Sequence, residues 1–76
     1  MKYILLERKN SEAPRPIEFG AHDRLRTFQM GYKQALMSQG WKSFATYHKD
    51  YYNLVDGNGQ HIQLYILTEQ EWKDEE

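Results

Sequence analysis

The chain has 76 residues, no cysteine, a net charge of −1 and an aromatic content of 14%. The absence of cysteine excludes a disulfide scaffold and a zinc site built on thiolates, and no apolar run reaches the roughly 18 residues that a membrane span requires. We therefore expect one compact domain over residues 1–76, of modest stability because so short a chain buries only about 60% of its unfolded surface. The first residues lack the pattern of a secretory leader, so we expect a cytoplasmic protein.

Charge is distributed unevenly along the chain. Residues 1–49 contain nine Lys or Arg and four acids, a net charge of +5, whereas residues 50–76 contain one Lys and seven acids, a net charge of −6. If the two halves lie apart in space, one side of the molecule attracts acidic surfaces and the other repels them. The alternative is a solvated surface that meets no charged partner.

Residues 1–7 are a short apolar run of the length of a β-strand. Ile4 and Leu6 alternate with Tyr3 and Leu5, so both faces of this strand are apolar. It is expected either to be covered on both sides or to present one face to a partner. The pattern does not predict which strand lies beside it.

Residues 8–20 are predicted to form an irregular connection. Pro14 and Pro16 fix their own backbone angles and bias the residues before them toward extended backbone. Connections of this length are uncommon in so small a domain, and long loops are often functional.

Residues 21–39 predict one amphipathic helix, because large or apolar side chains recur at helical spacing: Leu25, Phe28, Tyr32, Ala35, Leu36 and Gln39. Asp23 is expected as the N-cap or as an acid of the first turn, and Gly40 as the left-handed residue after the helix.

Three further residues of the helix are expected to serve packing. Gly31 lies in the middle, where glycine costs about 1 kcal/mol relative to alanine, and we expect it to allow a close approach of the helix backbone to the sheet. Met30 and Met37 are expected to widen the apolar face as core residues.

Residues 41–68 organise the fold, because they predict three consecutive strands at Trp41–Tyr47, Tyr51–Val55 and His61–Leu67. The segment His48-Lys49-Asp50 predicts the first turn, which would place Phe44 opposite Leu54. The segment Asp56-Gly57-Asn58-Gly59 predicts the second, a type I turn that ends with Gly59 in the left-handed conformation.

The second turn decides which side chains share a face of the sheet. With Gly59 as its last residue, Leu54 lies opposite Ile62 and Tyr52 lies opposite Leu64, and the face away from the helix carries Tyr51, Asn53, His61, Gln63 and Tyr65. A two-residue Asn58-Gly59 turn would instead direct the Asn53 amide into the core. We favour the first register because it separates apolar from polar side chains.

The chain ends with a helix signal. Thr68 and Glu71 have the spacing of a capping box, in which each side chain accepts a hydrogen bond from the other residue's backbone N–H. We expect a short helical turn that folds Trp72 back onto the domain.

The most specific surface feature is a row of three tyrosines, Tyr47, Tyr51 and Tyr65, which the predicted registers place side by side across three strands. Asn53 and His61 flank this row. Tyrosine is enriched at protein interfaces, and aromatic rings on a sheet can also stack on unpaired nucleic-acid bases. The alternative is that these tyrosines only pair with one another across strands.

The predicted helix carries a basic patch of Arg24, Arg26 and Lys33, which could meet an acidic protein surface or a phosphate backbone. Arg24 and Arg26 lie about 200° apart around a helix, so they do not form a tight cluster. A helix followed by three strands and a short helix is similar in order to double-stranded-RNA-binding domains. The last helix lacks a lysine-rich start and the chain ends acidic, so we do not assign it to that family.

No residue pattern predicts an enzyme. The three histidines, His22, His48 and His61, do not have the spacing of metal ligands. Ser43, His48 and Asp50 are close in sequence without the pattern of a nucleophile. The segment Gly57-Asn58-Gly59 precedes a strand, so no helix N-terminus is available for a phosphate. We expect no catalytic residue, no metal and no cofactor.

The sequence therefore predicts an α+β fold of order β-α-β-β-β, with one long helix on one face of a mostly antiparallel sheet, the first strand at an edge of the last three, and a short C-terminal helical turn. For function we predict a non-enzymatic binding module that engages a larger protein or complex, as an adaptor or inhibitor. Chains of this size and class are common among phage and mobile-element proteins that act on host machinery, which is an analogy only. The alternative is a domain that binds RNA or single-stranded DNA. The oligomeric state is not predicted, and a homodimer is one option.

Overall fold

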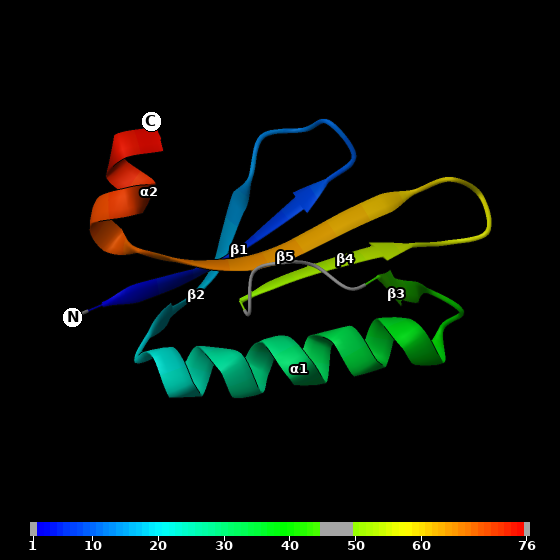
Figure 1. Cartoon of the computed structure of the whole chain (residues 1–76), viewed down its shortest axis with the longest axis horizontal. Coiled ribbons are helices and arrows are strands. Elements are labelled where there is room, and N and C mark those ends of the chain that lie inside the picture. Colours follow the sequence, from blue (N-terminus) through cyan, green and yellow to red (C-terminus); the bar gives the residue numbers. More distant parts are fainter. Residues whose placement is uncertain (1, 45–49, 76) are drawn as a thin grey trace.

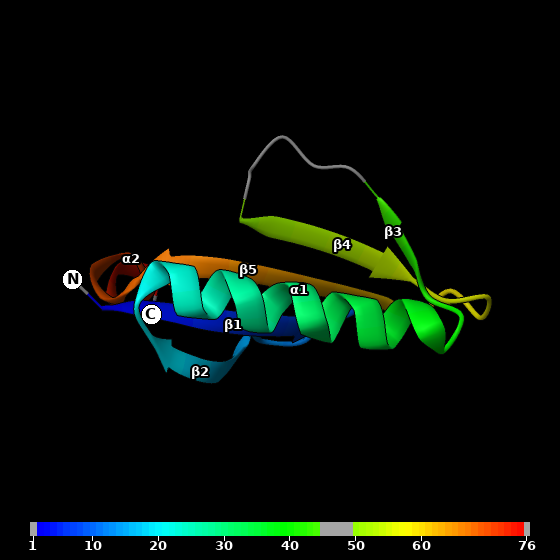
Figure 2. The same ribbon diagram turned by 90° about the horizontal axis from the view of Figure 1, so that it is seen from below.

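The computed structural model describes residues 2–44 and 50–75, except for the side chain of Glu75. In that part of the chain the elements are β1 (Tyr3–Lys9), β2 (Arg15–Gly20), α1 (His22–Ser38), β3 (Lys42–Phe44), β4 (Tyr51–Val55), β5 (His61–Thr68) and α2 (Glu69–Glu75). The strands form one antiparallel sheet in the order β2-β1-β5-β4-β3, and α1 lies along one face of it (Figures 1 and 2). The predicted α+β class is confirmed, with one strand more than the sequence indicated.

The additional strand, β2, lies in the stretch that was predicted to be an irregular connection. β1 continues to Lys9, the chain turns, and β2 runs back beside β1 with Phe19 opposite Ile4. Pro16 is compatible with this pairing because β2 is an edge strand and is paired on one side only. The pairing register shifts between Leu5 and Leu6, which marks a β-bulge in β2.

β1 is covered on both faces, one of the two possibilities that its sequence allowed. Ile4 and Leu6 pack with Tyr65 on one side of the sheet, and Leu5 packs with Leu25 of α1 on the other. β1 joins β5 at the edge of the predicted three-stranded sheet, and β2 then forms the outer edge.

The hairpin between β4 and β5 has the predicted register, with Tyr52 opposite Leu64 and Leu54 opposite Ile62. The Asp56 carboxylate accepts hydrogen bonds from the backbone N–H groups of Asn58 at 2.9 Å and Gln60 at 2.8 Å. Gly59 has a φ of +81°, where a side chain would be strained. The turn therefore fixes the register, and the register directs the apolar side chains toward α1.

The helix α1 begins after Ala21, with Asp23 in its first turn, and Gly40 follows it with a φ of +101°, as predicted. Leu25 and Gln29 are its buried residues, and Tyr32 and Leu36 pack against the cluster of Leu54, Ile62 and Leu64.

Three predictions about α1 are wrong. Phe28, Ala35 and Gln39, which were predicted to belong to the apolar stripe, are exposed. Met30 and Met37 are exposed, because the residues that face the sheet lie on another stripe of the helix, which leaves both methionines in solvent. A Cβ added to Gly31 would meet no atom within 4 Å. Gly31 is exposed and faces away from the contact with the sheet, so it does not serve a close backbone approach.

The predicted register of β3 is also wrong. Ser43, not Phe44, lies opposite Leu54, and Phe44 lies opposite Asn53. Trp41 packs against the Leu54 cluster, so the apolar contact is made before β3 begins and Phe44 points to the other face. Thr46, Tyr47, His48 and Lys49 lie outside the described residues.

The C-terminal capping box is confirmed. The Thr68 hydroxyl accepts the Glu71 N–H at 3.1 Å, and the Glu71 carboxylate accepts the Thr68 N–H at 2.9 Å. The cap starts α2, which runs for seven residues and places Trp72 against Ile4, Leu6 and Tyr65 on the side of the sheet away from α1. Within the described residues no helix combines the length and apolar character needed to cross a membrane.

Candidate protein-binding surface

The sheet face away from α1, here called the reverse face, carries two adjacent strips of side chains. The polar strip is Asn53, Gln63 and Arg8, which lie opposite one another across β4, β5 and β1. The apolar strip is Tyr51, Tyr65 and Leu6 on the same three strands. A surface with both polar and aromatic groups therefore arises from the alternation of side chains along the strands.

Two members of the predicted tyrosine row are adjacent, but they differ in exposure. The Tyr51 and Tyr65 rings are stacked, with centroids 4.7 Å apart and planes 6° from parallel. Tyr65 is only 5% exposed, because Ile4, Leu6 and Trp72 surround it, whereas Tyr51 is half-buried. The expectation that both rings are open to solvent is wrong for Tyr65, since α2 covers this part of the sheet. Tyr47 lies outside the described residues.

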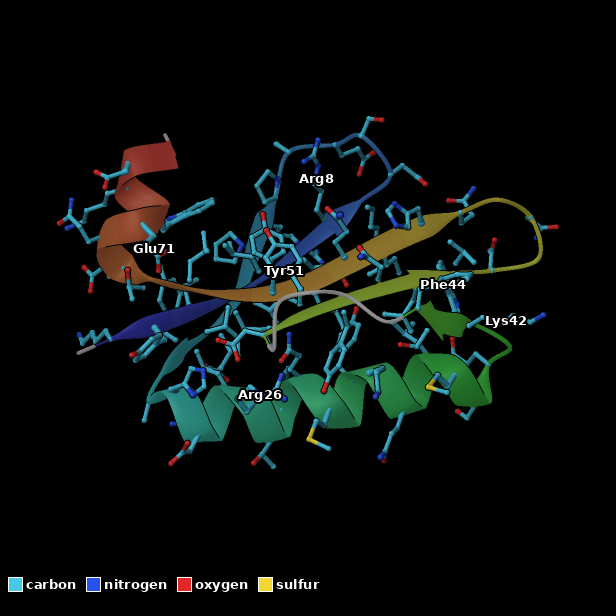
Figure 3. The ribbon with its side chains drawn as sticks, viewed as in Figure 1. Arg8, Arg26, Lys42, Phe44, Tyr51 and Glu71 are labelled. Atoms are coloured by element: carbon cyan, nitrogen blue, oxygen red, sulfur yellow. The ribbon has the colours of Figure 1, made fainter. Side chains whose placement is uncertain are left out.

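The chain rises on two sides of the reverse face and leaves a groove between them, here called the main groove, of about 710 Å³. The β1–β2 loop and α2 both lie on this side of the sheet (Figures 1 and 3). Residues of that loop, of the sheet and Trp72 of α2 line the groove. The groove is lined by Arg8, Ser11, Glu12, Ala13, Pro14, Tyr51, Gln63, Tyr65 and Trp72.

A second groove of about 610 Å³ begins on the other side of Trp72, where Ile4, Phe19, Lys2 and Lys73 are among the lining residues. Phe19 is 53% exposed. The indole of Trp72 lines both grooves, so a partner that covers one of them also reaches the boundary of the other.

Hydrogen bonds within the β1–β2 loop and between this loop and β5 hold it in place. Asn10 adopts a φ of 54°, its N–H donates to the carbonyl oxygen of His61 at 2.7 Å, and its side-chain oxygen accepts the His61 N–H at 2.9 Å. Arg8 donates from Nε to the carbonyl oxygen of Glu12 at 3.1 Å. The loop is thereby tied to the start of β5, and the Arg8 guanidinium is held at the edge of the main groove (Figure 3).

Several polar side chains on the reverse face make no hydrogen bond within residues 2–44 and 50–75. Asn53 Oδ1 is buried and has no partner there, although buried polar atoms usually have one. The side chains of Gln63 and His61 likewise make no hydrogen bond with the described residues. Within that part of the chain, these polar groups are unpaired.

The cations predicted as a basic patch lie on α1, across the sheet from the two tyrosines (Figure 3). Arg26 donates to Gln29 Oε1 at 2.9 Å and lies 3.6 Å from the Asp50 carboxylate. Lys33 lies 4.4 Å from the Tyr52 ring centroid, and Arg24 lies 4.0 Å from the Glu18 carboxylate. The structure therefore does not bring the predicted cations and tyrosines into one site.

The two helices carry opposite charge on opposite faces of the sheet (Figure 1). α1 holds three cations and one acid, whereas α2 has the sequence Glu-Gln-Glu-Trp-Lys-Asp-Glu. The two halves of the chain do not lie apart as a whole, because β4 and β5 lie between β1 and β3 in the sheet, but their difference in charge is present between the helices.

A carboxylate is buried between the sheet and α1. Glu7 is 2% exposed; it accepts a hydrogen bond from Arg15 at 2.7 Å, and the Tyr32 hydroxyl donates to its second oxygen. Burial, the hydrogen bond to Glu7 and the charge of that carboxylate raise the pKa of Tyr32 from 10.0 to about 12, while Arg15 opposes the shift. This group joins β1, β2 and α1, which is a structural role.

A second polar group lies at the other end of the α1 contact. Gln29 is fully buried and donates from Nε2 to the carbonyl oxygens of Asp50 at 2.8 Å and Leu64 at 3.0 Å. The Asp50 carboxylate lies 2.9 Å from Nε2 of His22. Asp50 therefore pairs with a histidine of α1, and its contacts fasten the start of β4 to the helix.

Within the described residues no group of three or more His, Asp or Glu side chains could hold a metal ion. No protein-family model, curated protein or solved structure matches the chain.

The sequence located part of this surface and missed the rest. Tyr51, Tyr65, Asn53 and His61 lie on the reverse face as predicted. Arg8 was missed, although extending the predicted first strand by one residue beyond Glu7 would have placed it on the face of Leu6. Phe19 and the loop wall were missed because β2 was not predicted, and Phe44 was missed because the register of β3 was predicted wrongly.

Proposed function

We propose that this protein is a small non-enzymatic protein-binding module that engages a larger protein through the reverse face and acts as an adaptor or inhibitor. The observation that carries the proposal is the main groove. There, aromatic side chains and an exposed arginine meet on a face that α2 covers only in part.

The residue types in the groove support contact with a protein. Tyrosine, tryptophan and arginine are the residues most enriched among those that dominate binding energy, and the main groove contains Tyr51, Trp72 and Arg8. Phe19 and Phe44, each 53% exposed, extend the apolar area to β2 and β3. A partner that buried these rings would remove water from apolar surface, which favours association.

The charge distribution favours a protein over a nucleic acid. A nucleic-acid surface needs several cations that contact phosphates, but the cations of α1 lie on the other face and are paired with Asp50, Glu18 or the Tyr52 ring. On the reverse face Arg8 is the one cation among the described residues that line the main groove. The acidic helix α2 borders the same groove, so a run of phosphates would lack the several cations that it needs there.

We also propose where the protein acts and which class of partner it meets. We place the protein in the cytoplasm, because a fold without cysteine does not depend on an oxidising compartment. The analogy with phage and mobile-element proteins of similar size makes host machinery the class of partner that we propose.

Affinity capture from the native host, followed by mass spectrometry, tests the proposal with two matched variants. Phe19→Ala removes a ring from the reverse face, and Phe28→Ala removes a ring of similar exposure, 43% against 53%, from α1. We expect wild-type protein and Phe28→Ala to recover the same partner, and Phe19→Ala to recover at least about tenfold less, as for a ring at the centre of an interface.

Two results would contradict the proposal. In one, the partner is lost with Phe28→Ala and kept with Phe19→Ala, which would move the contact to α1. In the other, wild-type protein recovers no partner above the level of an unrelated bait. Circular dichroism of both variants shows whether each is folded.

A further inference from the structure

The main groove has the form of a site for one extended segment of chain. Its lining residues come from the β1–β2 loop, the sheet and α2, and the loop and α2 lie far apart in the sequence. Its volume of about 710 Å³ is within the range of roughly 300–1,000 Å³ that is usual for sites that hold a small ligand. Several side chains of a partner would fit in it.

Arg8 supplies the charge on one wall. Its Nε is engaged by the carbonyl oxygen of Glu12, and its terminal nitrogens make no hydrogen bond within the described residues. A guanidinium fixed through Nε presents its outer nitrogens as a pair, the geometry that binds a carboxylate with two parallel hydrogen bonds.

The acid that contacts Arg8 does not pair with its charge. Glu12 accepts from Arg8 Nε through its backbone carbonyl, and no ion pair joins the two side chains within the described residues. On α2, Glu69 lies 3.5 Å from Lys73, and the Glu71 carboxylate caps the helix. Arg8 is the one cation among the described residues that line the main groove, so charge complementarity favours a carboxylate beside it.

Other residues of the groove floor can contact both a side chain and the main chain of an occupant. Tyr51 and Trp72 offer aromatic surface, and Gln63, beside Arg8 on the sheet, presents an amide that both donates and accepts. Asn53 lies opposite Gln63, outside the residues that line the groove, and has a buried oxygen without a partner. Main-chain N–H and C=O groups supply the matching donors and acceptors.

From these observations we infer that the main groove binds an extended acidic-apolar segment of the partner, with a large apolar side chain against Tyr51 and Trp72 and a carboxylate on Arg8. The inference rests on the proposed protein-binding function and specifies the chemistry of the bound segment. A nucleic acid is the less favoured occupant, because its further phosphates would lie beside α2.

Selection from a library of short random peptides displayed on phage tests this inference directly. The full-length protein is immobilised as wild type, as Arg8→Glu, and as the matched control Arg24→Glu, which reverses an exposed arginine on α1. We expect wild type and Arg24→Glu to enrich peptides in which a large apolar residue lies within a few positions of Asp or Glu. Arg8→Glu is expected to lose the acidic preference and to enrich Lys or Arg instead.

A binding measurement then gives the size of the effect. The most enriched peptide is synthesised, and its affinity is measured by isothermal titration with wild type, Arg8→Ala and Arg24→Ala. We expect Arg8→Ala to bind about tenfold or more weakly, as for the loss of a charge-assisted hydrogen bond, and Arg24→Ala to bind as wild type does.

Enriched peptides without an acidic residue, or with an affinity that does not depend on Arg8, would overturn the inference and leave the proposed function intact. Failure to enrich any peptide would overturn it as well. In that case capture of a partner that depends on Phe19 still supports protein binding, whereas loss of both results removes the proposed function too.

Discussion

The two faces of the sheet differ in whether their polar side chains are hydrogen-bonded. Toward α1, Glu7 and Gln29 are buried and each is held by two or more hydrogen bonds. On the reverse face, Asn53 and Gln63 lie opposite each other without a side-chain partner among the described residues. The comparison separates a face that holds the fold together from a face that remains available for contact.

The largest expected effect is a difference in the free energy of unfolding between the same substitution made on each of the two faces. Gln29→Ala should lower the free energy of unfolding by about 3 kcal/mol or more, because it leaves two buried carbonyl oxygens unpaired and creates a cavity. Gln63→Ala, on the reverse face, should change it by less than about 0.5 kcal/mol. Urea denaturation followed by circular dichroism measures both variants, and similar losses would remove the distinction between the faces.

A smaller effect is the pH dependence of stability that arises where Tyr32 and Arg15 contact the buried Glu7 carboxylate. The pKa of Tyr32 is raised to about 12, so the native state holds this proton more tightly than the unfolded chain does. The resulting stability is fully present below pH 10, the ordinary pKa of tyrosine, and is lost as the pH rises through about 12. Thermal unfolding between pH 9 and 12 should show a steeper loss in wild type than in Tyr32→Phe. Parallel curves would show that the Tyr32 proton does not contribute.

The parts of the fold that were predicted correctly are those that neighbouring residues determine. Asp56 and Gly59 fixed the β4–β5 register through contacts within the turn, and Thr68 with Glu71 fixed the start of α2. In both cases the residues that decide the structure are at most a few positions apart, so the sequence pattern is sufficient.

The parts that were missed depend on contacts between distant segments. β2 is stabilised by pairing with β1, which overrides the disruptive effect of Pro16 because β2 is an edge strand. Tyr65 is buried because Trp72 and Ile4 meet over it, and neither the position of β1 nor that of α2 followed from the sequence. For the same reason the main groove could not be predicted, since its two walls come from opposite ends of the chain.

The central claim is that the reverse face keeps unpaired polar groups for a partner at a cost in stability, and Asn53→Val tests it most directly. Valine suits a strand and removes the buried oxygen that has no partner. We expect the free energy of unfolding to rise by about 1 kcal/mol, which raises Tm by about 4–8 °C in a domain of this size. Capture of the partner from the native host should fall in parallel. A lower Tm, or a higher Tm with unchanged capture, would contradict the claim.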